Sequence, residues 1–528
     1  MTAVQTSTRV RSKRTKRGRA LWKPLLLLLA GTLIIGGVLA AADVIRSTYT
    51  LSVQISDQSQ THIDLNQSLA LSRYLLGSNV FPLFGTKYKD PSGQGFMSYS
   101  PQVVAGLRSA GIKLLRFPGG YDGEQHTLST EQLDAFSNLL NQTGAEGFMQ
   151  APLSDPLDKR PVPLATRATR AALLVDYMND RQSIQRTANA PFHAIKYWSV
   201  GNEPDLLRNP DTGKIYTVAE YTQAFIAYSL AMHTKDPSIQ VFGPEVSMYS
   251  AAGGPKDSQG TPWMSGFIQG VSDYERTHSL PFQLLNGVSF HYYPFSNQER
   301  HLTTILSDPR QWDTIVPGLR QLIRQSFSED LPIAITEINT NSGKVPLPKS
   351  VSALWWAETL GQLMDNQVNY VAFFSTEGVD SPNPLFLQRG LTQTPMLRVM
   401  QVISHMESYL VPVEGTPGPV SIYCTQGGSH ASASLLFVNQ TAFAQHISVR
   451  AETILPPGLW QRIPRDWGFW QDANLTLPAY SMAVLTLHRN GSNELFTFNN
   501  SVSRRVVSGA PPVQHVICRR AACAPQSA

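Results

Sequence analysis

Eight short apolar segments, each ending in a polar or charged residue, recur along the middle of this 528-residue chain. Their ends lie 34 to 53 residues apart, which leaves room each time for one helix and its loops. Eight such units between about residues 70 and 390 predict an α/β fold, a (β/α)8 TIM barrel. An open doubly wound sheet is the structural alternative, but no G-x-G-x-x-G or Walker pattern follows an early segment. The segments end at Asn79, Arg116, Gln150, Glu203, Glu245, His291, Glu337 and Ser375.

The chain after Pro395 has a different texture. Short alternating segments are separated there by turns rich in Gly, Pro and Asn, which predicts a C-terminal antiparallel β-sandwich. An alternating strand at 49–55 comes too early for the barrel and is expected to complete one sheet of that sandwich. The predicted divisions are a basic N-region with an apolar segment at 1–45, the early strand at 46–60, the catalytic barrel at 61–393, the β-sandwich at 394–495 and a poorly ordered tail at 496–528.

The N-terminal region carries an export signal. Eight Lys and Arg residues and no acidic residue lie in the first 42 positions, and residues 25–42 contain no charge. Two interpretations are open: a signal peptide cleaved after the run Ala40, Ala41, Ala42, or an uncleaved anchor with its basic flank in the cytoplasm. Eighteen apolar residues just suffice to span a bilayer. Either way the chain is expected to be extracellular, secreted or anchored to the membrane by this segment.

Composition and missing motifs exclude several classes of function. The formal net charge of +5 resides in the N-terminal region, and without it the chain is mildly acidic, so no nucleic-acid partner is expected. Of three cysteines, Cys518 and Cys523 could close a small loop and Cys424 is expected to be buried and single. No His-x-x-x-His pattern or G-x-S-x-G elbow is present, so neither a metal hydrolase nor a serine hydrolase is indicated.

Two glutamates end strands that a barrel brings to one mouth. Glu203 follows the apolar run in AIKYWSVGNEPD, and Glu337 ends the strand in LPIAITEINTNSG. They fall on the fourth and seventh predicted strands, and a barrel gathers all its strand carboxyl ends around one opening. Two carboxyl groups flanking a bond are the requirement for glycoside hydrolysis. Separations of ~5–5.5 Å would give retention of anomeric configuration and ~6.5–9.5 Å inversion.

These motifs resemble those of clan A glycoside hydrolases, which are retaining (β/α)8 enzymes. GNEPD, LRFPGG, HYY and the trailing β-domain are most similar to family 79, the β-glucuronidase and heparanase family. RFPGG is also similar to the arabinofuranosidase and β-xylosidase families 51 and 39. The resemblance covers roughly residues 50 to 490 and implies a retaining mechanism.

The resemblance also implies roles for individual residues. Glu203 would be the acid/base and Glu337 the nucleophile, while Asn202 would bond the sugar 2-hydroxyl. Arg116 would hold Glu337 in its ionised form, because a neighbouring opposite charge favours the carboxylate. One residue of the pair His291 and Tyr292 would bond the nucleophile. At the remaining strand ends, substrate-binding or supporting candidates are Asn79, Gln150 and Glu245.

The sequence therefore predicts an exported retaining glycoside hydrolase, β-glucuronidase-like, that cleaves a β-glycosidic bond by double displacement. A β-xylosidase, β-glucosidase or α-L-arabinofuranosidase of the same clan is an alternative, as is a catalytically dead, membrane-tethered carbohydrate-binding protein. The expected partner is an oligosaccharide, polysaccharide or other glycoside, together with the membrane if the N-terminal segment is uncleaved. No cofactor and no metal are expected.

Overall fold

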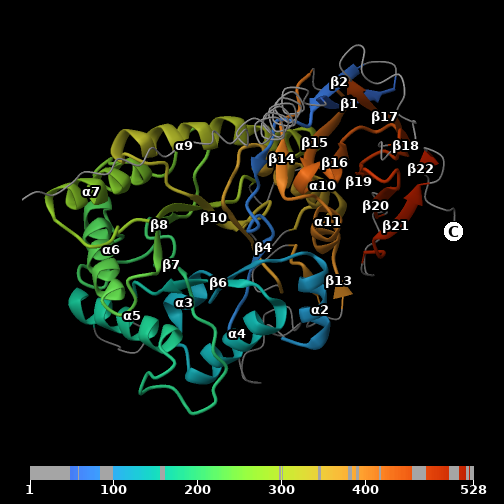
Figure 1. Cartoon of the computed structure of the whole chain (residues 1–528). Helices are drawn as coiled ribbons and strands as arrows, with labels where there is room; N and C mark the ends of the chain where they lie inside the picture. The colour runs from blue at the N-terminus through green and yellow to red at the C-terminus, as the bar shows by residue number, and fades with distance from the viewer. Residues whose placement is uncertain are drawn as a thin grey trace, which may run out of the picture.

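The computed structural model of the chain shows a helix-ringed barrel beside a domain made largely of strands (Figure 1). The structure describes residues 48–56, 59–83, 99–154, 161–295, 299, 301–342, 346–377, 383–387, 392–415, 418–454, 471–498, 510–518 and 522–523. The apolar N-terminal segment at 25–42 lies outside these residues. Within them, no helix has the length and apolar character needed to cross a bilayer.

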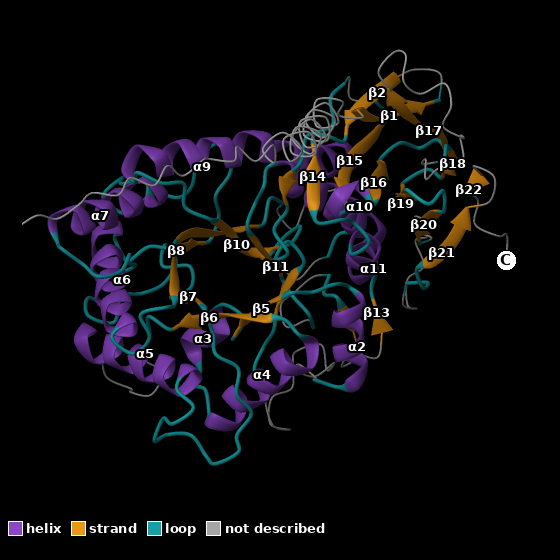
Figure 2. Ribbon diagram, in the orientation of Figure 1, coloured by secondary structure: helices purple, strands orange, loops and turns teal. Residues whose placement is uncertain are grey.

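Eight parallel strands close into a barrel, which confirms the predicted fold class. The strands follow one another around the ring in chain order and β11 closes it against β4. Figure 2 shows the ring of strands in orange. Every strand end predicted from the sequence lies in a barrel strand or within three residues of one. The barrel strands are β4 (Gly77–Asn79), β5 (Leu114–Phe117), β6 (Glu146–Ala151), β7 (Tyr197–Val200), β8 (Gln240–Val246), β9 (Gly287–Tyr292), β10 (Ile333–Ile338) and β11 (Tyr370–Phe373).

Helices surround the barrel and are started by local capping signals. Ser129 and Gln132 form a reciprocal capping box at the start of α4, and Thr217 and Glu220 form another at α6. Apolar faces of these helices pack on the outward-facing residues of the strands, such as Trp198. The helices are α2 (Pro101–Ser109), α3 (Tyr121–Gln125), α4 (Thr130–Thr143), α5 (Leu164–Asn179), α6 (Val218–His233), α7 (Trp263–Thr277), α8 (Leu302–Ser307), η1 (Asp308–Gln311), α9 (Trp312–Ser326), α10 (Lys349–Asp365) and α11 (Pro395–Ile403).

The two ends of the barrel interior differ in chemistry. At the amino ends of the strands, Phe148, Tyr197, Phe242 and Tyr370 form a buried cluster with Tyr74 packed against it. The Tyr74 and Tyr370 rings stack with their centroids 5.3 Å apart. Because aromatic rings fill that end, the buried polar side chains of the interior collect toward the carboxyl ends of the strands.

The second domain consists of two sheets with mostly antiparallel pairing. One has the order β2-β1-β17-β18-β22 and the other β21-β20-β19-β16-β15-β14-β3. Their strands are β1 (Thr48–Ile55), β2 (Ser59–Asp64), β3 (Leu69–Ala70), β14 (Tyr409–Val411), β15 (Val420–Gln426), β16 (Ser432–Asn439), β17 (Gln445–Ile454), β18 (Ala473–Leu477), β19 (Ser481–His488), β20 (Asn493–Thr497), β21 (Gln514–Cys518) and β22 (Ala522–Cys523). A short hairpin of β12 (Phe386–Leu387) and β13 (Thr392–Gln393) and the turn η2 (Gly428–His430) complete the elements.

The prediction of a poorly ordered tail from residue 496 needs correction for the described residues of that stretch, 496–498, 510–518 and 522–523. β21 pairs with β20 and β22 pairs with β18, so this stretch adds an edge strand to each sheet. Cys518 and Cys523 form a disulfide between these two strands. Cys424 is buried in β15. Strand β21 has no signal in the sequence because backbone pairing with β20 orders it, although its side chains are largely exposed.

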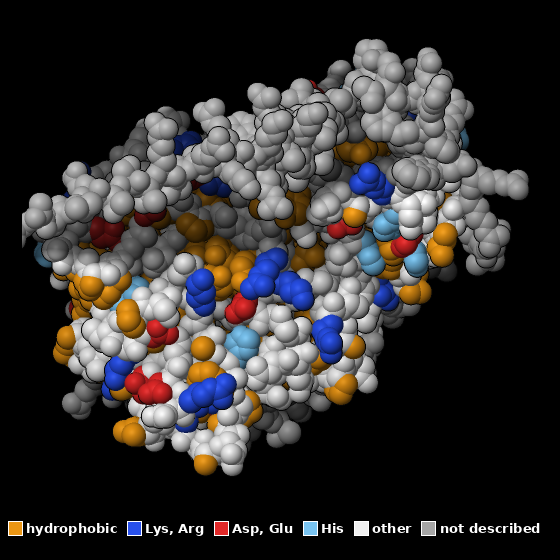
Figure 3. Space-filling model, in the orientation of Figure 1, with side chains coloured by type: hydrophobic (Ala, Val, Ile, Leu, Met, Phe, Trp, Pro, Cys, Tyr) orange, Lys and Arg blue, Asp and Glu red, His pale blue; other side chains and the backbone are white. Residues whose placement is uncertain are grey.

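The described surface carries mixed charge. On the face drawn in Figure 3, Lys and Arg side chains lie scattered among acidic, neutral and hydrophobic ones.

Candidate active site

The chain breaks sharply after β7 and thereby turns Glu203 toward the barrel mouth. Gly201 has φ 74°, and a side chain there would collide with Leu153, so only glycine fits without rearrangement. Glu203 itself has φ 45°, a left-handed conformation that a non-glycine residue seldom adopts. Its backbone N–H donates to the carbonyl oxygen of Glu245 at 2.9 Å, which fixes the turn against β8. Such local strain is concentrated at functional sites.

Arg116 connects several polar side chains at the barrel mouth through hydrogen bonds. Its side chain is fully buried, and its Nη1 donates to Asn79 Oδ1 and to Glu337 Oε1, both at 2.8 Å. The other terminal nitrogen, Nη2, donates to Glu245 Oε2 at 2.7 Å and to Asn202 Oδ1 at 2.9 Å. Nη2 also lies 3.5 Å from Gln150 Oε1. Two buried carboxylates beside a buried guanidinium compensate its charge.

Glu337 is held through both of its oxygens. Oε1 accepts from Arg116, and Oε2 accepts from the Tyr293 hydroxyl at 2.6 Å. Gly120, in the PGG turn after β5, has φ 73° and lies so close that a side chain there would collide with Glu337 Oε1. The carboxylate is 5% exposed and its orientation is therefore fixed by neighbours on three sides.

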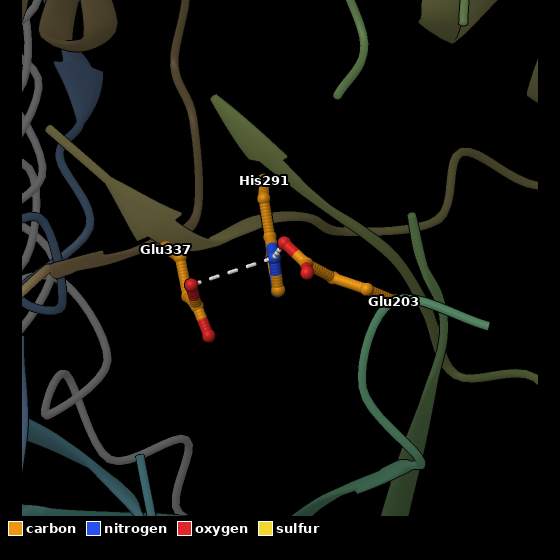
Figure 4. Close-up of side chains that lie close together, drawn as sticks. All are labelled: Glu203, His291 and Glu337. Atoms are coloured by element: carbon orange, nitrogen blue, oxygen red, sulfur yellow. Dashed lines mark hydrogen bonds and ion pairs between the residues drawn. The ribbon is translucent and has the colours of Figure 1, made fainter. Parts of the chain in front are cut away.

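His291 lies between the two glutamates, as Figure 4 shows. Its Nδ1 is 2.9 Å from Glu203 Oε1 and 3.6 Å from Glu337 Oε2, and its Nε2 is 3.4 Å from Glu245 Oε2. Burial of the ring disfavours its charge, but Glu337 and the hydrogen bonds to Glu203 and Glu245 outweigh burial and raise the pKa of His291 to about 10. The imidazole is thus held as a cation among carboxylates.

The neighbours of Glu245 favour its ionised form. It is fully buried, which disfavours ionisation, yet the charge of Arg116 and the contact with His291 lower the pKa of Glu245 to about 2. Like Glu203, it has a positive φ, 58°.

The two catalytic candidates face each other at short range. One donor atom from each of Glu203, His291 and Glu337 lies within 4.8 Å of the other two. Two carboxyl groups this close match a retaining pair better than an inverting one. A cation site has similar spacing, but Arg116 and protonated His291 already supply the positive charge here, and a protonated imidazole has no lone pair for a metal.

The structure brings eight of the nine sequence candidates together. Arg116 contacts Asn79, Gln150, Asn202, Glu245 and Glu337 directly, His291 contacts Glu245 and Glu337, and Glu203 contacts His291.

Tyr292 is the exception and its candidacy was wrong. Its hydroxyl donates to Asp308 Oδ1 at 2.9 Å, and its ring packs 4.6 Å from that of Trp312, outside the barrel. Successive side chains along a strand point to opposite faces, so an inward His291 sends Tyr292 outward and Tyr293 inward. The period of two along HYY was the signal that could have identified Tyr293.

Glu124 is a second residue that sequence reasoning missed. It lies in α3, is 4% exposed, and accepts from Gln150 Nε2 at 2.9 Å and from the backbone N–H groups of Leu153 and Ser154. Its carboxylate thereby fixes the amide of Gln150 beside Arg116. No strand-end position marks it in the sequence.

Comparison with known proteins agrees with this geometry. The family model described as glycoside hydrolase family 44 matches residues 130–296, which contain Glu203, Glu245 and His291. A search of curated protein sequences returned no match.

Several solved structures that share this fold are described as glycosidases. An α-L-arabinofuranosidase from Thermotoga maritima aligns with TM-score 0.56 and 15% identity over 79% of this chain and 97% of that one. A family 44 xyloglucanase from Paenibacillus polymyxa aligns with TM-score 0.52 and 12% identity, over 80% and 97%. A family 44 endoglucanase from Clostridium thermocellum aligns with TM-score 0.51 and 13% identity, over 83% and 99%. At identities this low, the structural likeness establishes the shared fold alone.

These findings give no support to the predicted resemblance to family 79. Motifs at strand ends are shared across the clan because they serve the same bond cleavage, so they separate its families poorly. The family 44 match and the carboxylate pair on a (β/α)8 barrel together lead to the coarser assignment: the chain is a glycoside hydrolase.

Proposed function

We propose that this chain hydrolyses a β-glycosidic bond of a neutral-sugar polysaccharide, of the β-glucan or xyloglucan class, with retention of configuration. The observation that carries the proposal is the pair Glu203 and Glu337, with carboxylate oxygens within 4.8 Å across one barrel mouth. The family 44 match over residues 130–296 supports the choice of substrate class.

The proposed mechanism has two steps. Glu337 attacks the anomeric carbon while Glu203 protonates the leaving oxygen, which gives a covalent glycosyl-enzyme. Glu203 then takes a proton from water as that water attacks the anomeric carbon and the bond to Glu337 breaks. Arg116 and Tyr293 hold the nucleophile in place before the reaction, so little reorganisation is needed. Asn202 Oδ1 accepts from Arg116 Nη2, which leaves the NH2 group of Asn202 to donate to the sugar 2-hydroxyl.

The charges at the mouth favour a neutral sugar over a uronic acid. Both terminal nitrogens of the Arg116 guanidinium are bonded to protein side chains, so they have no free edge for a substrate carboxylate. Lys344 and Arg389, which follow β10 and β11 in the chain, lie outside the residues that the structure describes. A β-glucuronidase thus has less support than the neutral-sugar alternatives.

A panel of substrates tests the proposal. Aryl β-glucoside, cellobioside, xyloside, galactoside, glucuronide and α-L-arabinofuranoside are compared, together with xyloglucan and carboxymethylcellulose, and the anomer first released is followed by NMR. We expect hydrolysis of the gluco-configured substrates, with the β-anomer appearing first. Preference for the glucuronide, or release of the α-anomer from a β-glycoside, contradicts the proposal.

An α-L-arabinofuranosidase is the second candidate, because enzymes of that activity are among the structures that share the fold over most of both chains. The arabinofuranoside in the panel decides between the two. A catalytically dead sugar-binding protein would show affinity without product, and the intact carboxylate pair speaks against it. The extracellular location stays a prediction.

A further inference from the structure

In the first step of the proposed mechanism, Glu203 must carry a proton that it can pass to the leaving oxygen. A glutamic acid that works as an acid near neutral pH is usually kept protonated by burial. The Glu203 side chain is 21% exposed and lies at the open side of the mouth. A buried neighbour within hydrogen-bond range could share the proton that Glu203 delivers.

His291 is positioned to be that group. Its side chain is fully buried, and Nδ1 lies 2.9 Å from Glu203 Oε1, within direct hydrogen-bond range. The opposite ring nitrogen, Nε2, faces Glu245 Oε2 at 3.4 Å. An imidazole whose second nitrogen donates to a fixed carboxylate has its tautomer and orientation set by that contact.

The charges around His291 favour one retained proton on the Glu203–His291 pair. Glu337 faces Nδ1 at 3.6 Å, and the Tyr293 hydroxyl holds Glu337 from the other side. Arg116 compensates one of the two anions Glu245 and Glu337, which leaves one negative charge to be balanced. On the loop of Glu203, Asp205 is occupied by the N–H and hydroxyl of Ser247, at 2.9 and 2.5 Å.

We propose that Glu203 and His291 share one dissociable proton and act together as the acid/base, and that Glu245 is the positioning residue that keeps this proton on the pair. The inference rests on the proposed glycosidase function. His291 with a proton on Nδ1 beside ionised Glu203, and neutral His291 accepting from protonated Glu203, differ only in the position of one proton along the 2.9 Å contact. The pair therefore has one macroscopic pKa, which belongs to neither residue alone.

The proton balance closes over the two steps. In the first, Oε1 of Glu203 passes the shared proton to the leaving oxygen as the glycosidic C–O bond breaks and Glu337 bonds to the anomeric carbon. The pair is then one proton short. In the second, the attacking water gives its proton to Glu203, the bond to Glu337 breaks, and the pair is restored. Glu245 and Arg116 keep their charge states throughout.

A change of charge at Glu245 tests the proposal through a pH profile. In E245Q the anion beside Nε2 is gone and Arg116 is less compensated, and both changes weaken proton binding by the pair. We expect the alkaline limb of kcat/KM, measured on an aryl glycoside with a poor leaving group, to move to lower pH by about one unit or more. E245D, which keeps the charge, should restore most of the shift. A loss by the same factor at every pH, with the limb unmoved, overturns the proposal.

D308N is the matched control. Asp308 is also a buried carboxylate and is bonded to Tyr292, the residue next to His291, but it lies outside the barrel. Its alkaline limb should coincide with that of the wild type, and an equal shift in D308N would overturn the assignment to Glu245. With a 2,4-dinitrophenyl glycoside, whose departure needs no acid, the limb should disappear from the wild-type profile.

A second readout does not depend on turnover. Histidine labelled with ¹⁵N, with the His291 signal assigned by its loss in H291N, reports the ring protonation directly. We expect the E245Q signal to titrate at lower pH than in the wild type; equal titration overturns the proposal. If the glycosidase assignment itself is wrong, no panel substrate is turned over by the wild type, and that result is distinct from active enzyme with an unmoved limb.

Discussion

Removal of the Tyr293 hydroxyl tests whether Tyr293, and not its neighbour Tyr292, holds the nucleophile Glu337. Y293F removes the 2.6 Å hydrogen bond to Glu337 Oε2 and leaves the ring in place. A hydrogen bond to a charged group contributes about 1.5–3 kcal/mol, and a barrier change of about 1.4 kcal/mol is tenfold in rate. We therefore expect kcat/KM to fall about 10- to 150-fold, since the bond orients the carboxylate in the transition state.

Y292F is the matched control, because it makes the same chemical change one residue earlier. The Tyr292 hydroxyl bonds Asp308 Oδ1, which also accepts from Gln311 Nε2 at 2.8 Å, so the acceptor keeps a partner. We expect a loss of about 1 kcal/mol in the free energy of unfolding and little change in kcat/KM. Steady-state kinetics on the preferred aryl glycoside and urea unfolding measure the two effects. The reasoning is refuted if Y292F loses activity as Y293F was expected to, or if Y293F retains it.

Three further predictions concern the same mouth. E337Q should abolish turnover, and a 2-deoxy-2-fluoro glycoside should label Glu337 in the wild type, as mass spectrometry of peptides would show; near-normal hydrolysis by E337Q would contradict the assignment. G120A should cost most of the activity because its methyl group collides with Glu337 Oε1, whereas G144A, with a similar φ of 68° and open space around it, should cost only about 1 kcal/mol of stability; equal activity in the two variants would refute this. The raised pKa of His291, about 10, lies above its unfolded value, so its contribution to stability is complete below about pH 6.5 and is lost as pH rises toward 10. The free energy of unfolding of the wild type should fall more steeply than that of H291N over that interval, by up to about 1.4 kcal/mol per pH unit.

The barrel could be predicted from the sequence because its signal is local. Each strand is buried on both faces and ends at the mouth, so an apolar run closed by a polar residue marks it, as in the run that ends at Glu337. The strand β21 has no such signal: most of its side chains are exposed, and it is ordered by pairing with β20. A sequence pattern reports side-chain burial and does not report backbone pairing at a sheet edge.

The residues of the candidate site also differ in how far the sequence predicts them. Position at a strand end predicted Arg116 and the two glutamates, since the barrel converts that position into proximity. The left-handed backbone at Glu203 and Glu245 and the close approach of Gly120 to Glu337 depend on contacts between different loops, which the sequence does not display. The glycosidase family was harder to predict than the site, because the shared strand-end motifs serve bond cleavage, whereas the loops determine which sugar is bound.

The pairing of β1 with β17 bears on the order in which the chain acquires its structure. Ser56, just after β1, bonds Gln445, 389 positions later, so the edge of β1 that β2 does not cover stays unpaired until most of the chain has been made. The barrel, whose strands each pair with sequence neighbours, can form during that time. Until synthesis reaches β17, that edge of β1 presents unpaired backbone N–H and C=O groups that must be kept from other chains, so premature termination before residue 445 should yield folded barrels that aggregate through β1.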